Sequence, residues 1–168
     1  TELVWIDLSN LPPLERPRSL MRMHAGFHSI ESPFPAAKVV DWISVPLGVA
    51  TLQDAYSDVK DDSARYALMS CHFEDNLADF APYKDEQKKS GFQIIGTSGT
   101  VTTLAASHLG LRRYDRTKVD GLRMTSEQID QVVSAYLSLG PDGRRNDPHI
   151  GQDRQALIMS GAAILQAL

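Results

Sequence analysis

Apolar residues near the N-terminus form a nearly unbroken run rather than an alternating pattern. Within Glu2–Leu8, four consecutive positions are LVWI, which is typical of a strand with both faces covered in a layered α/β sheet. Residues 11–18 contain three prolines and predict a turn. A weaker strand is predicted at Ser19–Gly26, and a third strand at Lys38–Val45. The short links between these strands favour an antiparallel meander.

Helical spacing of apolar residues dominates the rest of the chain. The elements predicted after residue 60 are a helix at Ser63–Ala81, a strand at Phe92–Ile95, a helix ending at Gly110, a short strand at Lys118–Met124, a helix opened by a capping box at Thr125–Gln128, a loop at Gly140–Gly151 and a helix at Gln152–Leu168. The order βββαβα(β)αα predicts a single α/β domain over residues 1–168, with helices packed over one mixed sheet.

Composition and charge narrow the classes of partner. The chain of 168 residues is 42% hydrophobic and 23% charged, with a net charge of −4, as in an ordinary soluble domain. This charge gives no overall positive field for nucleic acid or anionic lipid, so neither nucleic acid nor a membrane is an expected partner. The single cysteine, Cys71, excludes an internal disulfide and fits a cytoplasmic protein. Its place on the helix at Ser63–Ala81 predicts that it packs as a small hydrophobe.

The turn GTSGT, residues 96–100, is the strongest candidate for a binding site. Gly96 and Gly99 would allow positive φ angles and a close approach of a ligand, and the helix that follows presents free N–H groups. Together with the hydroxyls of Thr97, Ser98 and Thr100, these groups predict a phosphate site without a lysine. An ordinary tight turn with a capping serine explains the same residues, and both interpretations stay open. Thr103, one turn along the helix, is expected to point away from the turn.

Other candidate residues carry weaker signals. His24 and His28 have the spacing of a helical zinc pair, but no glutamate follows His24 and the segment is predicted as strand or turn, which favours exposed or structural histidines. Ser134 and Ser138 have no partnered histidine, so a serine nucleophile is excluded. A basic cluster is either a solvated loop or a guide for a polyanion beside the GTSGT turn; its members are Arg112, Arg113, Arg116 and Lys118, around Tyr114.

Five segments together resemble one family. TELVWID is similar to the continuation of a DxGGGSTE phosphate loop, and SVPLG at 44–48 is similar to an SLPLG segment. GTSGTVTTLAA followed by RYDRTKVDG resembles a second ligand loop and the segment after it, and DRQALIMSGAAIL at 153–165 resembles a DRADxILxGAAIL helix. In this order, and over nearly the whole chain, they resemble the exopolyphosphatase / guanosine pentaphosphate phosphatase family.

The resemblance implies a fold and a division of roles. It implies a ribonuclease-H-like lobe of the actin-like superfold, shared with sugar kinases and heat-shock ATPases, in which two lobes close on phosphates. The chain would be most of the second lobe. A first lobe, with the catalytic glutamate, and the DxGGGS residues are expected outside it, so no catalytic residue is expected in this chain. Gly96–Thr100 would face the ligand phosphates, and Glu2 would lie near a divalent metal ion, Mg²⁺.

The function that this resemblance implies is Mg²⁺-dependent hydrolysis of terminal phosphoanhydride bonds, in polyphosphate or guanosine pentaphosphate, by a two-lobed and homodimeric protein. The chain alone is expected to be inactive. One alternative is a non-hydrolytic, actin-like regulatory protein that senses a phosphate or a nucleotide. A sugar or acetate kinase of the same superfold is disfavoured by SVPLG and DRQALIMSGAAIL. A pure interaction module remains as a third alternative, because the face at Ala162–Leu168 is apolar.

Overall fold

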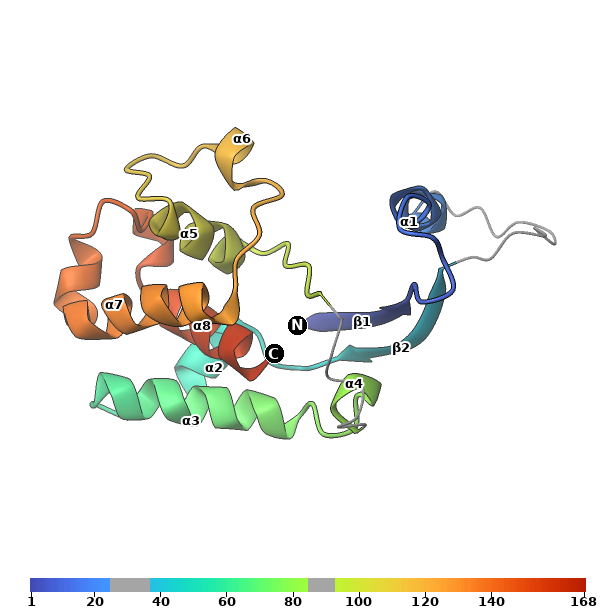
Figure 1. The fold of residues 1–168 in the computed structure, drawn as a ribbon. Coiled ribbons are helices and arrows are strands. Elements are labelled where there is room, and N and C mark those ends of the chain that lie inside the picture. The colour runs from blue at the N-terminus through green and yellow to red at the C-terminus, as the bar shows by residue number, and fades with distance from the viewer. Residues whose placement is uncertain (25–36, 85–92) are drawn as a thin grey trace. The chain divides into compact units, whose positions relative to one another are not determined.

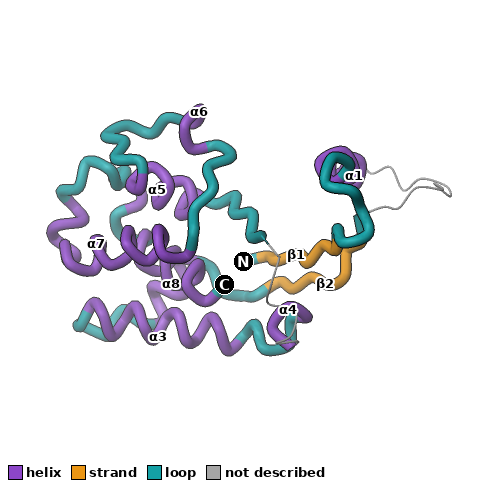
Figure 2. Tube along the Cα trace, in the orientation of Figure 1, coloured by secondary structure: helices purple, strands orange, loops and turns teal. Residues whose placement is uncertain are grey.

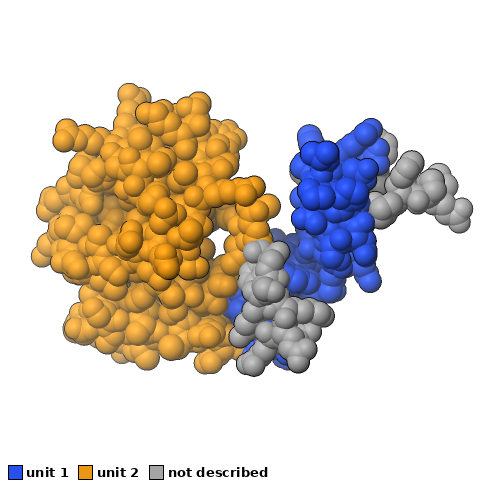
Figure 3. All heavy atoms as spheres, in the orientation of Figure 1, with its two compact units in different colours: residues 1–46, 77–91 blue, residues 47–76, 92–168 orange. Residues whose placement is uncertain are grey.

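The computed structural model describes residues 1–24, 37–84 and 93–168. The chain divides into two compact units, shown in different colours in Figure 3. Unit 1 comprises residues 1–46 and 77–91, and unit 2 comprises residues 47–76 and 92–168. The described residues contain both helices and strands (Figure 2), so the protein is of the α/β kind that the sequence predicts.

Unit 1 is built around a two-stranded antiparallel sheet (Figure 1). Strand β1 (Glu2–Asp7) pairs with β2 (Lys38–Ser44), and a register shift between Trp5 and Ile6 bulges the pair. The unit also contains helices α1 (Arg16–His24) and α4 (Ala81–Lys84). Asp41 of β2 holds the start of α4, because its Oδ2 accepts a hydrogen bond of 2.9 Å from the backbone N–H of Ala81. The two outer strands of the predicted meander are therefore confirmed.

The predicted middle strand at Ser19–Gly26 is wrong as far as residue 24, where the chain forms α1 instead. The sequence of α1, RPRSLMRMH, contains no β-branched residue, and its Leu, Met and Arg residues are good helix formers. Pro17 lies in the first turn, where a missing N–H costs nothing. His24 ends this helix, and His28 lies outside the described residues.

The prediction that β1 is covered on both faces is also wrong within the described part of the chain. Val4 of β1 is 57% exposed and Trp42, its partner on β2, is 65% exposed. Among the described residues the sheet has only these two strands, so this face of the pair carries large apolar side chains in contact with solvent.

Unit 2 is a helical layer in which α8 occupies the centre. Its elements are α2 (Val49–Ala55), α3 (Asp62–Asp75), α5 (Gly99–His108), α6 (Arg116–Val119), α7 (Ser126–Arg145), the 3₁₀ turn η2 (Gln152–Arg154) and α8 (Ile158–Ala167). Helix α8 packs against α2, α3, α5 and α7. The predicted apolar stripe of α7 is confirmed, since Val132, Val133 and Tyr136 are buried in one cluster with Leu104 and Ile158. Within residues 1–24, 37–84 and 93–168, no helix has the length and apolarity to cross a membrane.

Two predicted helix ends are confirmed by their hydrogen bonds. At the start of α7, Thr125 and Gln128 form the reciprocal capping box. At the end of α5, Gly110 has a φ of +64°. Its N–H donates to the carbonyl of Ser107, and the N–H of Leu111 donates to the carbonyl of Ala106. This pair of bonds is the Schellman motif, in which a glycine after the cap satisfies the last carbonyls of the helix.

Two predicted strands of unit 2 are wrong. The predicted strand Phe92–Ile95 is wrong over Gln93–Ile95, which form no strand and find no strand partner among the described residues; Ile95 is 74% exposed, and Phe92 lies outside the described residues. At the predicted strand Lys118–Met124 the chain forms α6 and a loop. Asp115 caps α6 by accepting a bond of 3.0 Å from the N–H of Thr117, and Gly121, with a φ of +75°, turns the chain after it. A capping aspartate and a left-handed glycine therefore replace the strand.

The predicted loop and last helix are wrong in their boundaries. Helix α7 continues to Arg145 across a kink at Gly140, because Pro141 follows the kink at a position that begins a new helical turn. The predicted helix Gln152–Leu168 is divided into η2 and α8. Helix α2 is absent from the predictions altogether.

The predicted helix at Ser63–Ala81 is confirmed over most of its length, as α3, but the predicted packing of its cysteine is not. Met69 and Phe73 are fully buried, whereas Cys71 is exposed. Cys71 lies two positions from each of these residues, about 200° around the helix, and so points to the opposite side. The prediction that Cys71 packs in the core is wrong.

An ion pair joins α3 to α7. The guanidinium of Arg144, whose side chain is 4% exposed, donates to both carboxylate oxygens of Asp62 at 2.8 and 2.9 Å. It also donates to the carbonyl of Tyr136 at 2.7 Å. Arg65 adds a third bond, of 2.8 Å, to Asp62. Asp62 is therefore the counter-charge for two arginines, one of them buried.

Candidate functional site

The GTSGT turn leads into α5, and its glycines serve close packing. Neither Gly96 nor Gly99 has a positive φ, so the prediction of left-handed backbone at these two positions is wrong. A Cβ on Gly96 would come within 2.7 Å of a methyl group of Val101, one turn along the chain. Gly96 therefore allows the turn to fold onto the first turn of its own helix.

Gly99 leaves room for an arginine from a distant part of the sequence. An ideal Cβ at this position would overlap the guanidinium group of Arg154, which belongs to η2. Gly99 is the first residue of α5. The absence of a side chain thus lets a positive group approach the end of the helix where unpaired N–H groups collect.

The hydroxyl residues of the turn have different surroundings. Thr97 and Ser98 are exposed, and Ser98 caps α5 by accepting a long bond of 3.4 Å from the N–H of Val101. Thr100 is only 9% exposed and packs on Gly161 of α8, where a Cβ on the glycine would overlap the threonine side chain. The turn therefore offers exposed hydroxyls at Thr97 and Ser98, while Thr100 is part of a close helix crossing.

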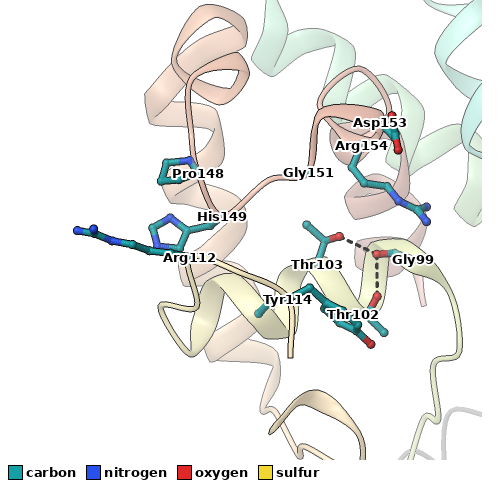
Figure 4. A pocket seen from close by; sticks show the side chains of 11 residues that line it. Gly99, Thr102, Thr103, Arg112, Tyr114, Pro148, His149, Gly151, Asp153 and Arg154 are labelled. Carbon is teal, nitrogen blue, oxygen red and sulfur yellow. Dashed lines mark hydrogen bonds between the residues drawn. The ribbon is translucent and has the colours of Figure 1, made fainter. Parts of the chain in front are cut away.

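A cavity of about 480 Å³ opens beside Gly99 in unit 2 (Figure 4). Its walls come from α5, from the loop before α6, from the segment between α7 and η2, and from η2 itself. The lining residues are Gly99, Thr102, Thr103, Ala106, Arg112, Tyr114, Pro148, His149, Gly151, Asp153 and Arg154. This volume lies within the range of about 300–1,000 Å³ that is usual for ligand sites. The expectation that Thr103 points away from the site is wrong, since Thr103 lines this wall.

The hydroxyls on the α5 wall are already engaged as donors. Thr102 donates to the carbonyl of Gly99 at 3.1 Å, and Thr103 donates to the same carbonyl at 2.8 Å. These bonds are the dashed lines in Figure 4. The donors left for a ligand at this end are therefore the backbone N–H groups of the first turn and the guanidinium of Arg154.

The cavity carries more positive than negative side chains, although the whole chain is acidic. Arg112 and Arg154 are exposed on its walls, opposed by the carboxylate of Asp153. Within the described residues, the side chain of Arg154 makes no hydrogen bond or ion pair. His149 also lines the cavity, and its Nδ1 lies 2.7 Å from the carboxylate of Asp147. The site therefore offers unpaired guanidinium charge to an anion.

Only part of the predicted basic cluster reaches the cavity. Arg112 and Tyr114 line it, whereas Arg113 does not. Arg116 pairs with Asp120 at 3.4 Å, and Lys118 lies 3.9 Å from Asp115.

Ser134 and Ser138 lie on α7, where the hydroxyl of Ser138 donates to the carbonyl of Ser134 at 2.8 Å.

The predicted metal ligand Glu2 belongs to the other unit. It is the exposed first residue of β1 in unit 1. Across residues 1–24, 37–84 and 93–168, no group of three or more His, Cys, Asp or Glu side chains is placed to hold a metal ion. The described residues thus do not form a metal site by themselves. The role of Glu2 as a metal ligand stays a prediction.

For several residues that line the cavity, the sequence predicted no function. Arg154 was part of the DRQALIMSGAAIL segment, but that segment served only as evidence for a helix and a family. His149, Gly151 and Asp153 lie in a stretch predicted as loop or helix. The sequence signal that points to them is the pair Asp153-Arg154, which follows Gly151 and precedes a buried apolar helix. Charged residues in this position lie at the edge of a packed layer.

Replacement of Gly99 by alanine tests how Arg154 is seated. The new Cβ would overlap the guanidinium and displace it, so we expect the affinity for inorganic phosphate to fall severalfold. The melting temperature should change little, because Gly99 is not left-handed and Arg154 is exposed and free to move. Calorimetric titration and a melting curve measure both quantities. Gly48→Ala is the matched control: Gly48 caps α2 in the same unit, and its Cβ would meet nothing closer than 4.0 Å. Equal phosphate affinity in both variants would contradict the prediction.

Comparison with solved structures adds two similar proteins. The first is described as the Aquifex aeolicus member of the Ppx/GppA protein family; it is 26% identical, has a TM-score of 0.62, and matches over 77% of this chain and 41% of its own. The second, a type II variant of the Aquifex aeolicus Ppx/GppA phosphatase, is 24% identical with a TM-score of 0.58, over 77% and 42% of the two chains. No family model matches the chain, and no curated protein matches it at a significant level.

The chain has an α/β fold that also occurs within these two larger proteins. It spans less than half of the length of each. Its sequence motifs and its fold then agree on the family. The chain is similar in fold to a Ppx/GppA family member, which confirms the resemblance that its sequence indicates.

Proposed function

We propose that this chain supplies the phosphate-binding surface of an exopolyphosphatase or guanosine pentaphosphate phosphohydrolase, with the ligand in the cavity beside Gly99. The chain would correspond to most of the second, ribonuclease-H-like lobe of an actin-like, two-lobed core. The family relationship supports the reaction class, and the shorter span of this chain supports the assignment to one lobe.

The position of Arg154 is the observation that carries the proposal. Its guanidinium lies against Gly99 at the N-terminus of α5, where the helix dipole is also positive. Two positive groups that face each other repel one another, and the guanidinium makes no ion pair among the described residues. A phosphate group bound between them would accept hydrogen bonds from both and remove the repulsion. The Gly96–Thr100 turn then contributes backbone N–H groups and the exposed hydroxyls of Thr97 and Ser98.

The reaction requires groups beyond those of the cavity. Guanidinium and backbone N–H groups stabilise charge on a transferred phosphoryl group, but they do not activate water. The general base is assigned to a glutamate of a first lobe. Mg²⁺ commonly binds through one or two carboxylates together with phosphate oxygens. Glu2 is the carboxylate proposed for this role.

The first experiment measures binding of inorganic tripolyphosphate to the chain by isothermal titration calorimetry. We expect saturable binding that weakens as salt is raised, because the contacts are electrostatic. Absence of saturable binding at low salt would overturn the proposed function.

The second experiment measures phosphate release. With Mg²⁺ and tripolyphosphate, we expect this chain to release inorganic phosphate no faster than buffer, because the proposed general base belongs to a first lobe. A two-lobed protein that contains the chain should release it steadily. Hydrolysis by the chain alone would show that the assignment of the base to a first lobe is wrong. Binding without hydrolysis in the two-lobed protein would favour the sensor over the enzyme.

A further inference from the structure

Arg154 reaches Gly99 from the short turn η2, which needs support from elsewhere in unit 2. Within the part of the chain that the structure describes, the side chain of Arg154 makes no hydrogen bond or ion pair. Its place beside Gly99 therefore depends on what fixes the backbone of η2. The turn has three residues and no side-chain cap at its start, so it is too short to hold itself in place.

Helix α7 is interrupted shortly before its end. Gly140 has non-helical backbone angles and Pro141 has no N–H, so the ladder of backbone hydrogen bonds is broken here. The last turn of the helix must therefore be oriented by other contacts. Arg144 in this turn donates to the carbonyl of Tyr136, on the other side of the kink, at 2.7 Å. It also donates to both carboxylate oxygens of Asp62 on α3, at 2.8 and 2.9 Å. One buried guanidinium thus clamps the two parts of α7 to each other and to α3.

The clamped turn is bonded directly to the segment that carries Arg154. The side-chain amide of Gln155 donates to the backbone carbonyl of Arg145 at 2.8 Å. Gln155 directly follows Arg154 in the chain, and Arg145 directly follows Arg144. A path of hydrogen-bonded contacts therefore runs from α3 through the end of α7 to η2. Asp62, Arg144 and Gln155 are not among the residues that line the cavity.

Stability alone does not account for the buried ion pair between Arg144 and Asp62. Among the described residues, the Nε–H of Arg144 is buried without an acceptor, which costs free energy. A buried ion pair is often no more stabilising than apolar side chains of similar volume, because both charges lose their hydration. The pair does provide a defined geometry, since a planar guanidinium with several donors fixes the directions of its partners.

We propose that the ion pair of Asp62 and Arg144 positions Arg154. The pair acts through Gln155, and its effect is felt where the guanidinium meets Gly99. The inference rests on the proposed function for its effect on binding, whereas the placement of Arg154 is measured without a ligand. Removal of the negative charge of Asp62 would by electrostatics alone favour an anion. Weaker anion binding in Asp62→Asn therefore reports placement and not charge.

The test is a double-mutant cycle on the whole chain, with inorganic tripolyphosphate as the probe in calorimetric titrations below the melting transition. Asp62→Asn and Gln155→Met should each weaken binding by about twofold to tenfold, the effect of one lost neutral hydrogen bond. The double variant should bind about as well as the weaker single variant, because both changes break one path; independent effects would multiply. In ¹⁵N NMR spectra of the ligand-free chain, the amide signal of Gly99 should shift in both single variants.

Two matched controls use exposed residues of the same elements. Asp75→Asn removes a carboxylate from the other end of α3, and Gln152→Met replaces the first residue of η2. Neither residue lines the cavity. Neither change should weaken binding or shift the amide signal of Gly99.

The outcomes separate this inference from the proposed function. If Asp62→Asn and Gln155→Met leave the affinity and the Gly99 signal unchanged, the positioning role is wrong and the phosphate contact stands. If their effects on affinity multiply, the two residues share no path and the inference is again wrong. If Asp62→Asn does not fold, Gln155→Met decides alone. If the unaltered chain does not bind the probe, the proposed function fails, and the Gly99 signal in the variants still decides whether the pair positions Arg154.

Discussion

Replacing Arg154 with alanine is expected to lower the affinity for inorganic tripolyphosphate by about tenfold to a hundredfold. The guanidinium is the positive side chain seated against Gly99 at the start of α5, and it has no other partner among the described residues. A hydrogen bond to a charged group contributes about 1.5–3 kcal/mol, and each 1.4 kcal/mol is tenfold in affinity. The melting temperature should change little, since the side chain makes no hydrogen bond or ion pair among the described residues. Calorimetric titration at low salt gives the affinity.

Two further variants show whether geometry or charge is responsible. Arg116→Ala removes the same charge from an exposed residue away from the cavity and should change affinity less than twofold. Arg154→Lys keeps the charge but loses the planar fork, and should give an intermediate affinity. Equal losses in Arg154→Ala and Arg116→Ala would mean that the ligand responds only to net charge, and the site at Gly99 would be wrong.

Replacing Asp62 with asparagine is expected to lower the free energy of unfolding by about 3 kcal/mol at pH 7. The change leaves Arg144, whose side chain is 4% exposed, without its counter-charge, and a buried ion pair broken on one side costs about 3–5 kcal/mol. Asp62 itself is 15% exposed, which places the loss at the lower end. Urea unfolding measures it. The control, Asp142→Asn, breaks a pair with Arg145 in which both side chains are well exposed, and should cost under about 0.5 kcal/mol.

The pH dependence of the same pair has a definite sign. Burial raises the pKa of Asp62, but the hydrogen bonds and charges of Arg144 and Arg65 outweigh it and hold the pKa below its ordinary value of 3.8. A lowered folded-state pKa stabilises the protein above the unfolded value and ceases to do so as pH falls through the folded value. The difference between the unaltered chain and Asp62→Asn should therefore shrink in acid. A difference that stays constant from pH 7 to pH 2 would show that the pair is not what Asp62 contributes.

The elements that the sequence predicts well are those whose signals are local. The capping box at Thr125, the C′ glycine at Gly110 and the apolar stripe of α7 involve neighbours within a few residues, and the structure has all three. Strands are predicted less well, because a strand depends on a partner elsewhere. β1 and β2 find one another, whereas Gln93–Ile95 finds no partner among the described residues. The segment at Ser19 shows the opposite error, since helix-forming residues were assigned to a strand to complete a meander.

The candidate site was predicted only in part, because some of its contacts join residues that are distant in the sequence. The GTSGT turn is visible in the sequence, but the interpretation of its glycines was incomplete. Gly99 is small because Arg154 lies against it, and the two residues are 55 positions apart. No pattern within the turn reports such a contact. Arg112 was singled out as a possible guide for a polyanion, yet the sequence offered no means to separate it from Arg113, which does not line the cavity.

The most direct test of the account is an NMR titration of the ¹⁵N-labelled chain with inorganic tripolyphosphate. We expect saturable shifts that cluster at the amides of Gly99, Thr100, Gly151 and Arg154, with one common dissociation constant, and that saturate in Arg154→Ala only at about ten to a hundred times higher tripolyphosphate concentration. Shifts confined to the exposed arginines of α1, or no saturable shift at all, would contradict it, because the cavity beside Gly99 would then bind no phosphate.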